Sequence, residues 1–268
     1  KLDFDYIIHS ASIASPTFYR KYPIETMDAN VWGLRNLLDF ALIKSKTKKR
    51  VKGFLYFSTS EIYGNPDKTN IPTKENYNGN VSCVGPRSSY DESKRFGETL
   101  CVNFSKEHKL PIKIVRPFNN YGPGLKLKDK RLIPDIMNNI LSKKNITIYS
   151  DGSPTRTFCY IADAIHGYLN ALIIGKSGDY YNIGNDQDEI TVKNLVKKII
   201  FLSSKIIDFK PKIIIKKSKE KDYLVDNPQR RCPDLYKSRK DLKYKAKINL
   251  NDGILRTIMW YKSNMKFK

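Results

Sequence analysis

Tyr90 and Lys94 lie four residues apart in the segment SSYDESKRFGE, and this pair could carry out acid–base chemistry. If the segment is a helix, the two side chains share one face. A tyrosine has a pKa of about 10 and is a poor base near pH 7, but a neighbouring ammonium group favours the phenolate. Such a phenolate could take the proton of a substrate hydroxyl. The pair alone is weak evidence, because the chain contains 17 tyrosines and is rich in lysine.

A second polar cluster, STSEIYG at 58–64, follows the apolar run VKGFLYF. The run is typical of a buried strand, so the cluster stands where that strand leaves the core. It places one carboxylate, Glu61, directly after the hydroxyls of Thr59 and Ser60. A serine hydroxyl is far too weak an acid to replace a carboxylic acid at neutral pH. Among residues 58–61, Glu61 is therefore the one that could move a proton.

The elements that must bring these clusters together alternate between strand and helix in the first half of the chain. Each strand candidate is a continuous apolar run, and each helix candidate has apolar residues at helical spacing. We expect strands at about 4–12, 52–60 and 112–118, and helices at about 28–46 and 89–108. This alternation indicates a parallel sheet that is covered on both faces.

The regular alternation of strands and helices changes after the turn-rich segment NNYGPG. The pattern predicts helices at about 132–141, 161–174, 191–204 and 251–262, with strands at about 146–150, 179–185 and 211–217. We expect a smaller lobe over the carboxyl ends of the sheet, where open α/β sheets bind ligands. The predicted division assigns 1–118 and 157–185 to the sheet domain, and 119–156 and 186–268 to the lobe.

The net charge of +22 raises the possibility of binding to nucleic acid. The excess is mostly lysine that is spread over several segments, whereas nucleic-acid-binding segments usually carry more arginine with interleaved aromatic residues. We therefore do not expect specific nucleic-acid binding, although the charge could attract an anionic substrate.

Other parts of the composition exclude further classes of protein. No run of about 18 apolar residues occurs, so no membrane span is expected. The four cysteines are scattered without a CxxC pair, which is typical of free thiols in a reducing cytoplasm. The three histidines, His9, His108 and His166, are not clustered, so no metal site is expected.

Seven motifs occur in one order along the chain: DYIIHSASIASP, NVWGLRNLLDFA, STSEIYG, YDESK, RPFNNYGPG, DGSPTRTFCYIAD and YNIGN. In this order they resemble the extended short-chain dehydrogenase/reductase family, in its NAD-dependent epimerase/dehydratase branch. Within that branch, Thr59-Ser60-Glu61 and RSSYDESKR are most similar to the UDP-glucuronate decarboxylases. The resemblance implies bound NAD, a nucleotide-sugar substrate and transient oxidation at carbon 4 of the sugar.

The chain departs from the family in one respect. Family members begin with a strand, a glycine-rich turn that holds the cofactor pyrophosphate, and an acidic residue further on. No G-x-x-G-x-x-G occurs in this sequence. The expectation is therefore an incomplete Rossmann-like α/β fold in an N-terminally truncated sequence, which by itself would bind NAD weakly or not at all.

The resemblance also implies roles for individual residues. The catalytic set would be Thr59, Ser60, Glu61, Tyr90, Lys94 and Arg231, with Arg230 as the alternative to Arg231. The cofactor would contact Ala11, Ser12, Thr59, Tyr90, Lys94 and Pro117. The substrate would contact Arg87, Asn119, Arg131, Tyr149 and Arg156; for Arg87 a solvated loop position, and for Arg156 an ion pair with Asp163 or another acid, remain open.

The alternatives differ in chemistry. A dTDP-glucose 4,6-dehydratase would have an aspartic acid where this chain has Ser60, and a 4-epimerase usually has a neutral residue where it has Glu61. An inactive fragment and a basic nucleic-acid-binding module are remoter alternatives. The resemblance also implies a homodimer formed by the helices at about 28–46 and 89–108, and Leu100, Val102 and Phe104 are apolar residues that would permit it.

Overall fold

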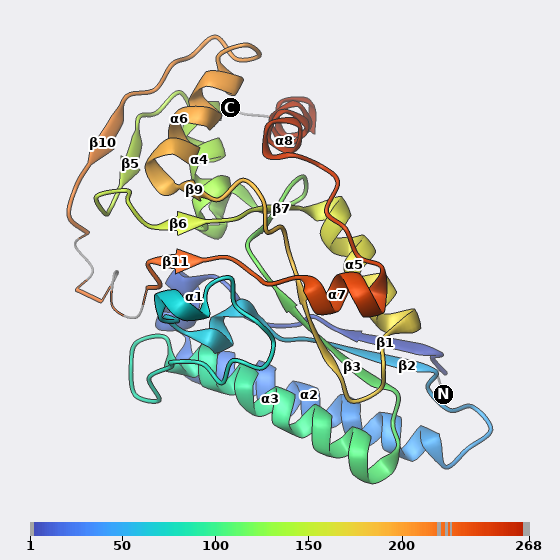
Figure 1. Cartoon of the computed structure of the whole chain (residues 1–268). Helices are drawn as coiled ribbons and strands as arrows, with labels where there is room; N and C mark the ends of the chain where they lie inside the picture. The colour runs from blue at the N-terminus through green and yellow to red at the C-terminus, as the bar shows by residue number, and fades with distance from the viewer. Residues whose placement is uncertain (1–2, 219–220, 223–224, 226, 265–268) are drawn as a thin grey trace.

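The computed structural model describes residues 3–218, 221–222, 225 and 227–264. Its centre is a sheet of four parallel strands in the order β1-β2-β3-β8 (Figure 1). The strands are β1 (Tyr6–His9), β2 (Gly53–Phe57), β3 (Ile112–Pro117) and β8 (Tyr180–Ile183). The nearly continuous burial of β2 and β3 explains why they read as apolar runs without alternation. The predicted parallel α/β sheet is confirmed.

Two long helices, α2 (Pro23–Ser45) and α3 (Ser88–His108), pack together and cover one face of the sheet (Figure 1). Leu34 and Leu38 of α2 lie in one core with Cys101 of α3 and with Phe54 and Ile112 of the sheet. The helix α2 begins five residues before the predicted start, at Pro23, because proline suits the first helical position. A short helix before it, α1 (Pro16–Lys21), was not predicted from the sequence.

The other face of the sheet is covered by α5 (Ile161–Ile174) together with α7 (Tyr236–Leu242). Leu235, Leu242 and Tyr244 lie in the same core as Leu55 and Val115 of the sheet. The C-terminal segment around α7 therefore packs against the sheet, although the predicted division places it in the lobe. Among the described residues no strand pairs with the outer edge of β1.

The remaining elements form a second layer beyond the carboxyl ends of the strands (Figure 1). Its core joins α4 (Leu132–Leu141), α6 (Val192–Ser203) and α8 (Leu250–Asn264) with β5 (Ile146–Ile148), which pairs in parallel with β10 (Ile213–Ile215). Short strands link this layer to the sheet: β4 (Asn120–Tyr121) with β7 (Cys159–Tyr160), and β6 (Thr155–Arg156) with both β9 (Ile190–Thr191) and β11 (Arg230–Arg231). Three 3-10 turns complete the described elements: η1 (Ser60–Tyr63), η2 (Lys68–Asn70) and η3 (Leu127–Asp129).

Candidate active site

The end of β2 places Glu61 on a short, buried turn. Thr59 stands at the N-cap of η1, and its side-chain oxygen accepts a hydrogen bond of 3.2 Å from the backbone N–H of Glu61. This cap fixes the direction in which the chain leaves the strand. Ser58, Thr59 and Ser60 are all buried, so the polar cluster lies inside the molecule rather than on a solvated loop.

The carboxylate of Glu61 is held between two arginines. Arg231 donates to both of its oxygens, with Nη2 at 2.7 Å from Oε2, and Arg87 donates to Oε2 as well. Burial alone would raise the pKa of Glu61, but the charges of Arg231 and Arg87 outweigh it and hold the pKa well below its usual range. Glu61 is therefore ionised at neutral pH.

The two neighbouring arginines of NPQRRCPD take different directions. Because β11 pairs with β6 beside Arg156, Arg231 is buried and points to Glu61. Arg230 instead forms two hydrogen bonds, of 2.7 and 2.8 Å, to the carboxylate of Glu189. The structure thus joins Arg231, and not Arg230, to the cluster.

Arg87 is a buried residue and not a solvated loop residue. Besides its bond to Glu61, its Nε lies 3.6 Å from Oδ2 of Asp91, in the first turn of α3. Asp91 is buried, and its Oδ1 has no hydrogen-bond partner among the described residues. Burial raises the pKa of Asp91, and the nearby charge of Glu61 raises it further. Asp91 was not predicted as a site residue. The available signal in the sequence was its position four residues after Arg87, which favours contact between the two side chains on a helix.

Tyr90 and Lys94 share the buried face of α3, as predicted. The Lys94 ammonium donates to the backbone oxygen of Phe57 at 2.7 Å and lies 5.9 Å from the centre of the Tyr90 ring. The expected lowering of the tyrosine pKa is not found: burial raises the pKa of Tyr90, although its hydrogen bond with Thr59 acts in the opposite direction. Burial also lowers the pKa of Lys94, to about 7, which weakens the ammonium charge on which that expectation depended.

The ring of Tyr90 is stacked on Tyr19 of α1, with the ring centres 4.9 Å apart. Tyr19 is buried, its hydroxyl has no hydrogen-bond partner among the described residues, and the Arg87 guanidinium lies over its ring. The sequence offered no signal for Tyr19, because α1 itself was not predicted. The unpredicted helix thus supplies one wall of the site.

A buried polar network lies beside the cluster and ties its supporting segments together. Asn182 of β8 accepts a hydrogen bond of 2.7 Å from the Tyr63 hydroxyl, at the end of η1. Its side-chain amide donates to the backbone oxygens of Thr73 and Asp234, at 2.9 and 3.1 Å. Arg116 of β3 donates to the same Tyr63 hydroxyl at 2.8 Å. The turn that carries Glu61 and the segment that follows Arg231 are therefore joined through one side chain.

Comparisons with known proteins identify the family of the chain. Residues 1–184 match the model of the "NAD dependent epimerase/dehydratase family". The chain belongs to this family. It is 36% identical over 267 residues to UDP-glucuronic acid decarboxylase 1 of Arabidopsis thaliana, covering 98% of the chain and 56% of that protein. It is 35% identical to UDP-glucuronic acid decarboxylase 6 of the same plant, covering 94% of the chain and 68% of that protein.

The fold is also similar to that of a solved family member. UDP-glucuronic acid 4-epimerase from Bacillus cereus, in complex with UDP-glucuronic acid and NAD, is 26% identical with a TM-score of 0.77. The alignment covers 97% of this chain and 76% of that one. The chain thus spans little more than half of the first plant relative and about three quarters of the epimerase.

The residues present fit one end of the family's cofactor. Ser12 follows β1, and Pro117 is the last residue of β3. Both lie at the same edge of the sheet as Thr59, and Ala11 lies beside Ser12. The hydroxyl oxygen of Ser12 is buried without a hydrogen-bond partner among the described residues, so it could bond a ligand there. With Tyr90 and Lys94, these residues suit the ring at which hydride is exchanged. A glycine-rich turn for the pyrophosphate is not part of this sequence.

The four residues expected on the nucleotide side lie in or beside the second layer. Asn119 follows β3 and donates to the backbone oxygen of Thr157 at 3.1 Å. Arg131 bonds to Asp129, and Tyr149 follows β5 and is partly exposed. Arg156 is buried and donates to backbone oxygens, among them that of Pro228 at 2.5 Å. Asp163 bonds instead to the backbone N–H groups of Lys247 and Ile248, which argues against the alternative of an ion pair between Arg156 and Asp163.

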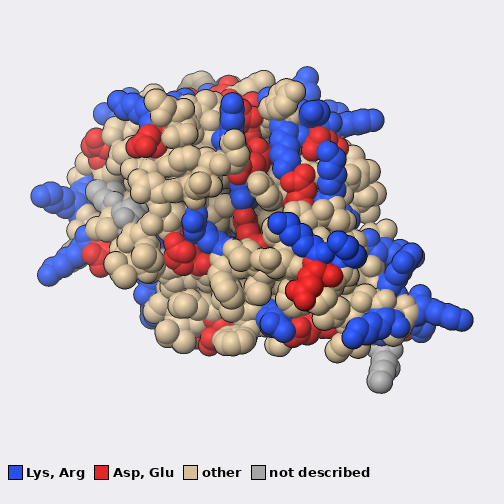
Figure 2. All heavy atoms as spheres, turned by 60° about the horizontal axis from the view of Figure 1, so that its bottom comes forward, with Lys and Arg blue, Asp and Glu red and all other residues tan. Residues whose placement is uncertain are grey.

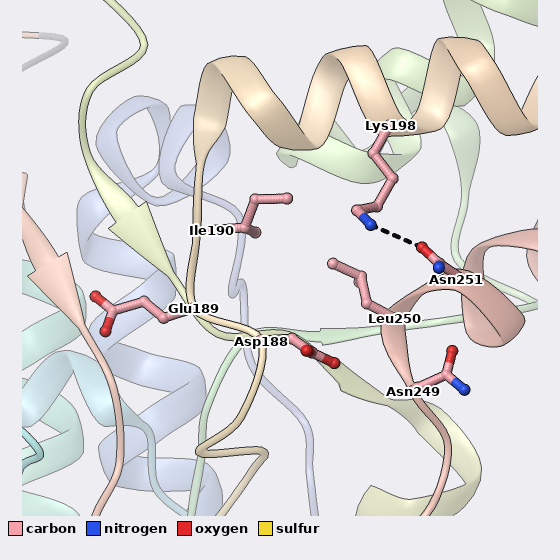
Figure 3. Close-up of a pocket in the computed structure, with 7 residues that line it drawn as sticks. All are labelled: Asp188, Glu189, Ile190, Lys198, Asn249, Leu250 and Asn251. Carbon is pink, nitrogen blue, oxygen red and sulfur yellow. Dashed lines mark hydrogen bonds between the residues drawn. The ribbon is translucent and has the colours of Figure 1, made fainter.

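Two surface hollows are lined by residues other than Glu61, Arg87 and Arg231. One, of about 270 Å³, is lined by Asp188–Ile190, Lys198 and Asn249–Asn251, and Figure 3 shows Lys198 bonded to Asn251 across it. The other, of about 450 Å³, is lined by Lys74–Asn76, Tyr180, Asp234, Tyr236 and Lys237. Neither contains a residue that was predicted from the motifs.

The surface charge shows no single basic patch on the face drawn in Figure 2, where Lys and Arg side chains are interspersed with Asp and Glu. Among the described residues, no helix is long and apolar enough to cross a membrane. No group of three or more His, Cys, Asp or Glu side chains in the same residues could hold a metal ion.

Proposed function

We propose that the protein containing this chain decarboxylates UDP-glucuronate through a 4-keto intermediate, to UDP-xylose or its 4-keto form. The observation that carries the proposal is the ionised Glu61 held by Arg231 and Arg87, with Ser60 beside it. The names of the two plant relatives point to the same reaction.

NAD, when bound, would accept a hydride from carbon 4 of the sugar and later return it. Tyr90 would take the proton of the 4-hydroxyl, and Thr59 would hydrogen-bond the same oxygen. Since burial raises the pKa of Tyr90, the tyrosine needs a positive charge close to it before it can act as a base at neutral pH. Lys94 lies on the correct face to supply that charge when protonated.

Once carbon 4 is a ketone, the uronate carboxylate is in the β position and can leave as carbon dioxide. The electrons of the broken bond flow into the carbonyl, so no acid is needed to expel a hydroxyl, and the resulting enolate then takes a proton from solvent at carbon 5. What helps is fixed positive charge and hydrogen bonds that place the carboxylate and stabilise the enolate. We assign this role to Arg231 and Arg87 with Glu61, and an assisting hydrogen bond to Ser60.

On the nucleotide side, we propose Asn119, Arg131, Tyr149 and Arg156 as contacts. Arg156 is buried and, among the described residues, its printed hydrogen bonds all go to oxygens of uncharged groups. A guanidinium held in this way keeps its charge for an anion, and a diphosphate is the anion that suits its fork.

A 4-epimerase acting on UDP-glucuronate is the second candidate, because the Bacillus cereus epimerase has a similar fold. Glu61 argues against it, since the family's epimerases usually carry a neutral residue at this position. The two reactions share the oxidation at carbon 4 and differ in whether the carboxyl carbon is lost.

Incubation of the protein with NAD and UDP-glucuronate labelled at carbon 6 decides between them. Release of the label as carbon dioxide is expected. UDP-galacturonate as product would establish the epimerase. In a parallel incubation, conversion of dTDP-glucose to a 4-keto-6-deoxy sugar, with no label released from UDP-glucuronate, would establish the dehydratase.

Two substitutions test the division of roles. Tyr90→Phe should abolish the first oxidation, so that no NADH absorbance appears. Glu61→Gln should retain more of that oxidation than of carbon dioxide release. Equal loss of both steps in both variants would contradict the assignment.

We also propose that the protein is a homodimer in the cytoplasm. Phe104 is buried in the chain's own core, and Leu100 and Val102 pack against that core with part of their surface exposed. Other apolar residues of α2 and α3 are exposed instead: Ile24, Met27, Trp32, Ile43 and Phe96. Sedimentation equilibrium would test the dimer, and the free thiols of all four cysteines are compatible with a reducing compartment.

A further inference from the structure

The site holds a second carboxyl group for which the proposed reaction has no use. Asp91 lies beside the same guanidinium that binds Glu61, with its Oδ2 3.6 Å from Arg87 Nε. Only 4% of its side chain is exposed. One of its oxygens has no hydrogen-bond partner among the described residues, although a buried ionised carboxylate normally has its lone pairs occupied.

Counting the charges around Arg87 shows what this second acid could do. Arg87 and Arg231 carry two positive charges, and Glu61 carries one negative charge, which leaves one positive charge uncompensated within this group. The charge of Arg156 also acts on Arg87 and Glu61, and the proposed function assigns it to the diphosphate. If Asp91 is neutral, that charge remains for a ligand anion. If Asp91 is ionised, the cluster is already neutral, and a ligand carboxylate would bring an unpaired negative charge into a buried site.

We propose that Asp91 carries a proton when the site binds a nucleotide sugar with a carboxylate, so that binding of the uronate is coupled to protonation of Asp91. Asp91 would then determine specificity. When it is neutral, the group of Arg87, Arg231 and Glu61 keeps one net positive charge, at the place where a uronate brings a negative charge and a hexose does not. This inference rests on the proposed function, since it concerns the carboxylate of that substrate.

The groups that surround Asp91 are consistent with a proton shared in this way. Arg87 and Arg231 favour its ionised form, whereas burial and the charge of Glu61 disfavour it and raise its pKa to about 7. Tyr19 from α1 and Tyr90 from α3 are neutral, since burial raises the pKa of both. The buried polar residues of α2, Thr26 and Asn30, are uncharged. Arg95, one turn along α3, donates to the carbonyls of Ile62 and Asn78 instead.

The test compares the binding of UDP-glucuronate and UDP-glucose to the protein by calorimetry between pH 6 and pH 8. NADH replaces NAD, so that no oxidant is present and the sugar is not turned over. Neither the uronate carboxyl nor a diphosphate diester titrates in this range. If only the protonated form binds, the affinity for UDP-glucuronate relative to UDP-glucose should fall about tenfold from pH 6 to pH 8. At pH 8, binding of UDP-glucuronate should take up nearly one proton more than binding of UDP-glucose, as measured in buffers of different ionisation enthalpy; the comparison cancels any proton taken up by Lys94, whose pKa is also about 7.

Asp91→Asn mimics the neutral acid and should make the ratio of affinities the same at both pH values. The matched control is Glu92→Gln, which makes the same change of charge at the next residue, which is partly exposed, and should keep the pH dependence of the unaltered protein. A ratio that does not change with pH, with no uptake of protons, would overturn the coupling while leaving the decarboxylase proposal intact. Failure of UDP-glucuronate to bind better than UDP-glucose at any pH would overturn both.

Discussion

Asn182 offers the sharpest test of how the site is held together, because its side chain is fully buried and makes three hydrogen bonds. In Asn182→Ala, the Tyr63 hydroxyl keeps its bond from Arg116, and the Thr73 oxygen keeps its bond from the N–H of Asp234. The Asp234 oxygen loses the bond that the Asn182 amide gave it. At about 1 kcal/mol for each bond, the loss of three predicts destabilisation by about 3 kcal/mol.

Urea unfolding followed by circular dichroism would measure this change, with the dependence on urea concentration expected to stay constant while the midpoint falls. Asn182→Asp keeps the acceptor for Tyr63 but turns a carboxylate oxygen toward two carbonyls, so it should destabilise the fold at least as much. Asn103→Ala is the control: Asn103 is exposed on α3 and, within the described part of the chain, its side chain bonds only to Thr99 one turn away, so a change within about 0.5 kcal/mol is expected. A loss below about 1 kcal/mol in Asn182→Ala would refute the idea that this side chain joins the supporting segments.

Two further substitutions test the packing and the electrostatics of α3. In Gly97→Ala, the added Cβ would lie 2.1 Å from the hydroxyl of the fully buried Tyr56. Overpacking should therefore outweigh the gain in helix propensity and destabilise the protein by about 1–2 kcal/mol, measured by the same urea unfolding. A stabilised variant would show that the tyrosine moves freely. Because the pKa of Asp91 is raised from 3.8 to about 7, the folded protein keeps a proton that the unfolded chain has lost, and its contribution to stability falls as the pH rises through this window. Asp91→Asn should therefore show a shallower decline in stability than the unaltered protein between pH 4.5 and pH 7.5, and identical pH profiles would contradict a raised pKa.

The fold could be predicted from the sequence wherever one element buries a continuous or periodic apolar pattern. The helices α4 and α5 begin and end at the predicted residues, and the three strands of the first half lie within their predicted ranges. The elements that were missed are short: α1, α7 and the two-residue strands. They contain too few residues for a period to show, and their formation depends on contacts with distant parts of the chain.

For the site, too, relations within one element could be predicted from the sequence, whereas relations between distant elements could not. Motif residues on one element, such as Tyr90 and Lys94, could be paired by spacing alone. The resemblance favoured Arg231 over Arg230, but spacing alone could not decide between them, because the choice depends on which side of β11 faces Glu61, about 170 positions earlier in the chain. The direction of the Tyr90 pKa was wrong for a related reason: spacing shows which charge is near, but not how deeply the hydroxyl is buried.

The electrostatics of Glu61 bear on the choice of reaction. A dehydratase requires one acid that gives a proton to the departing 6-hydroxyl and one base that removes the proton at carbon 5. Ser60 is too weak an acid for the first task, and Glu61, whose pKa is held low by two arginines, is a weak base for the second. Decarboxylation needs neither, because carbon dioxide leaves the electrons of the broken bond behind in the carbon-4 carbonyl, fixed positive groups stabilise the resulting enolate, and a proton from solvent then adds at carbon 5. On this reasoning Arg231 and Arg87 are the chemically important members of the cluster, and Glu61 acts mainly by holding them in place.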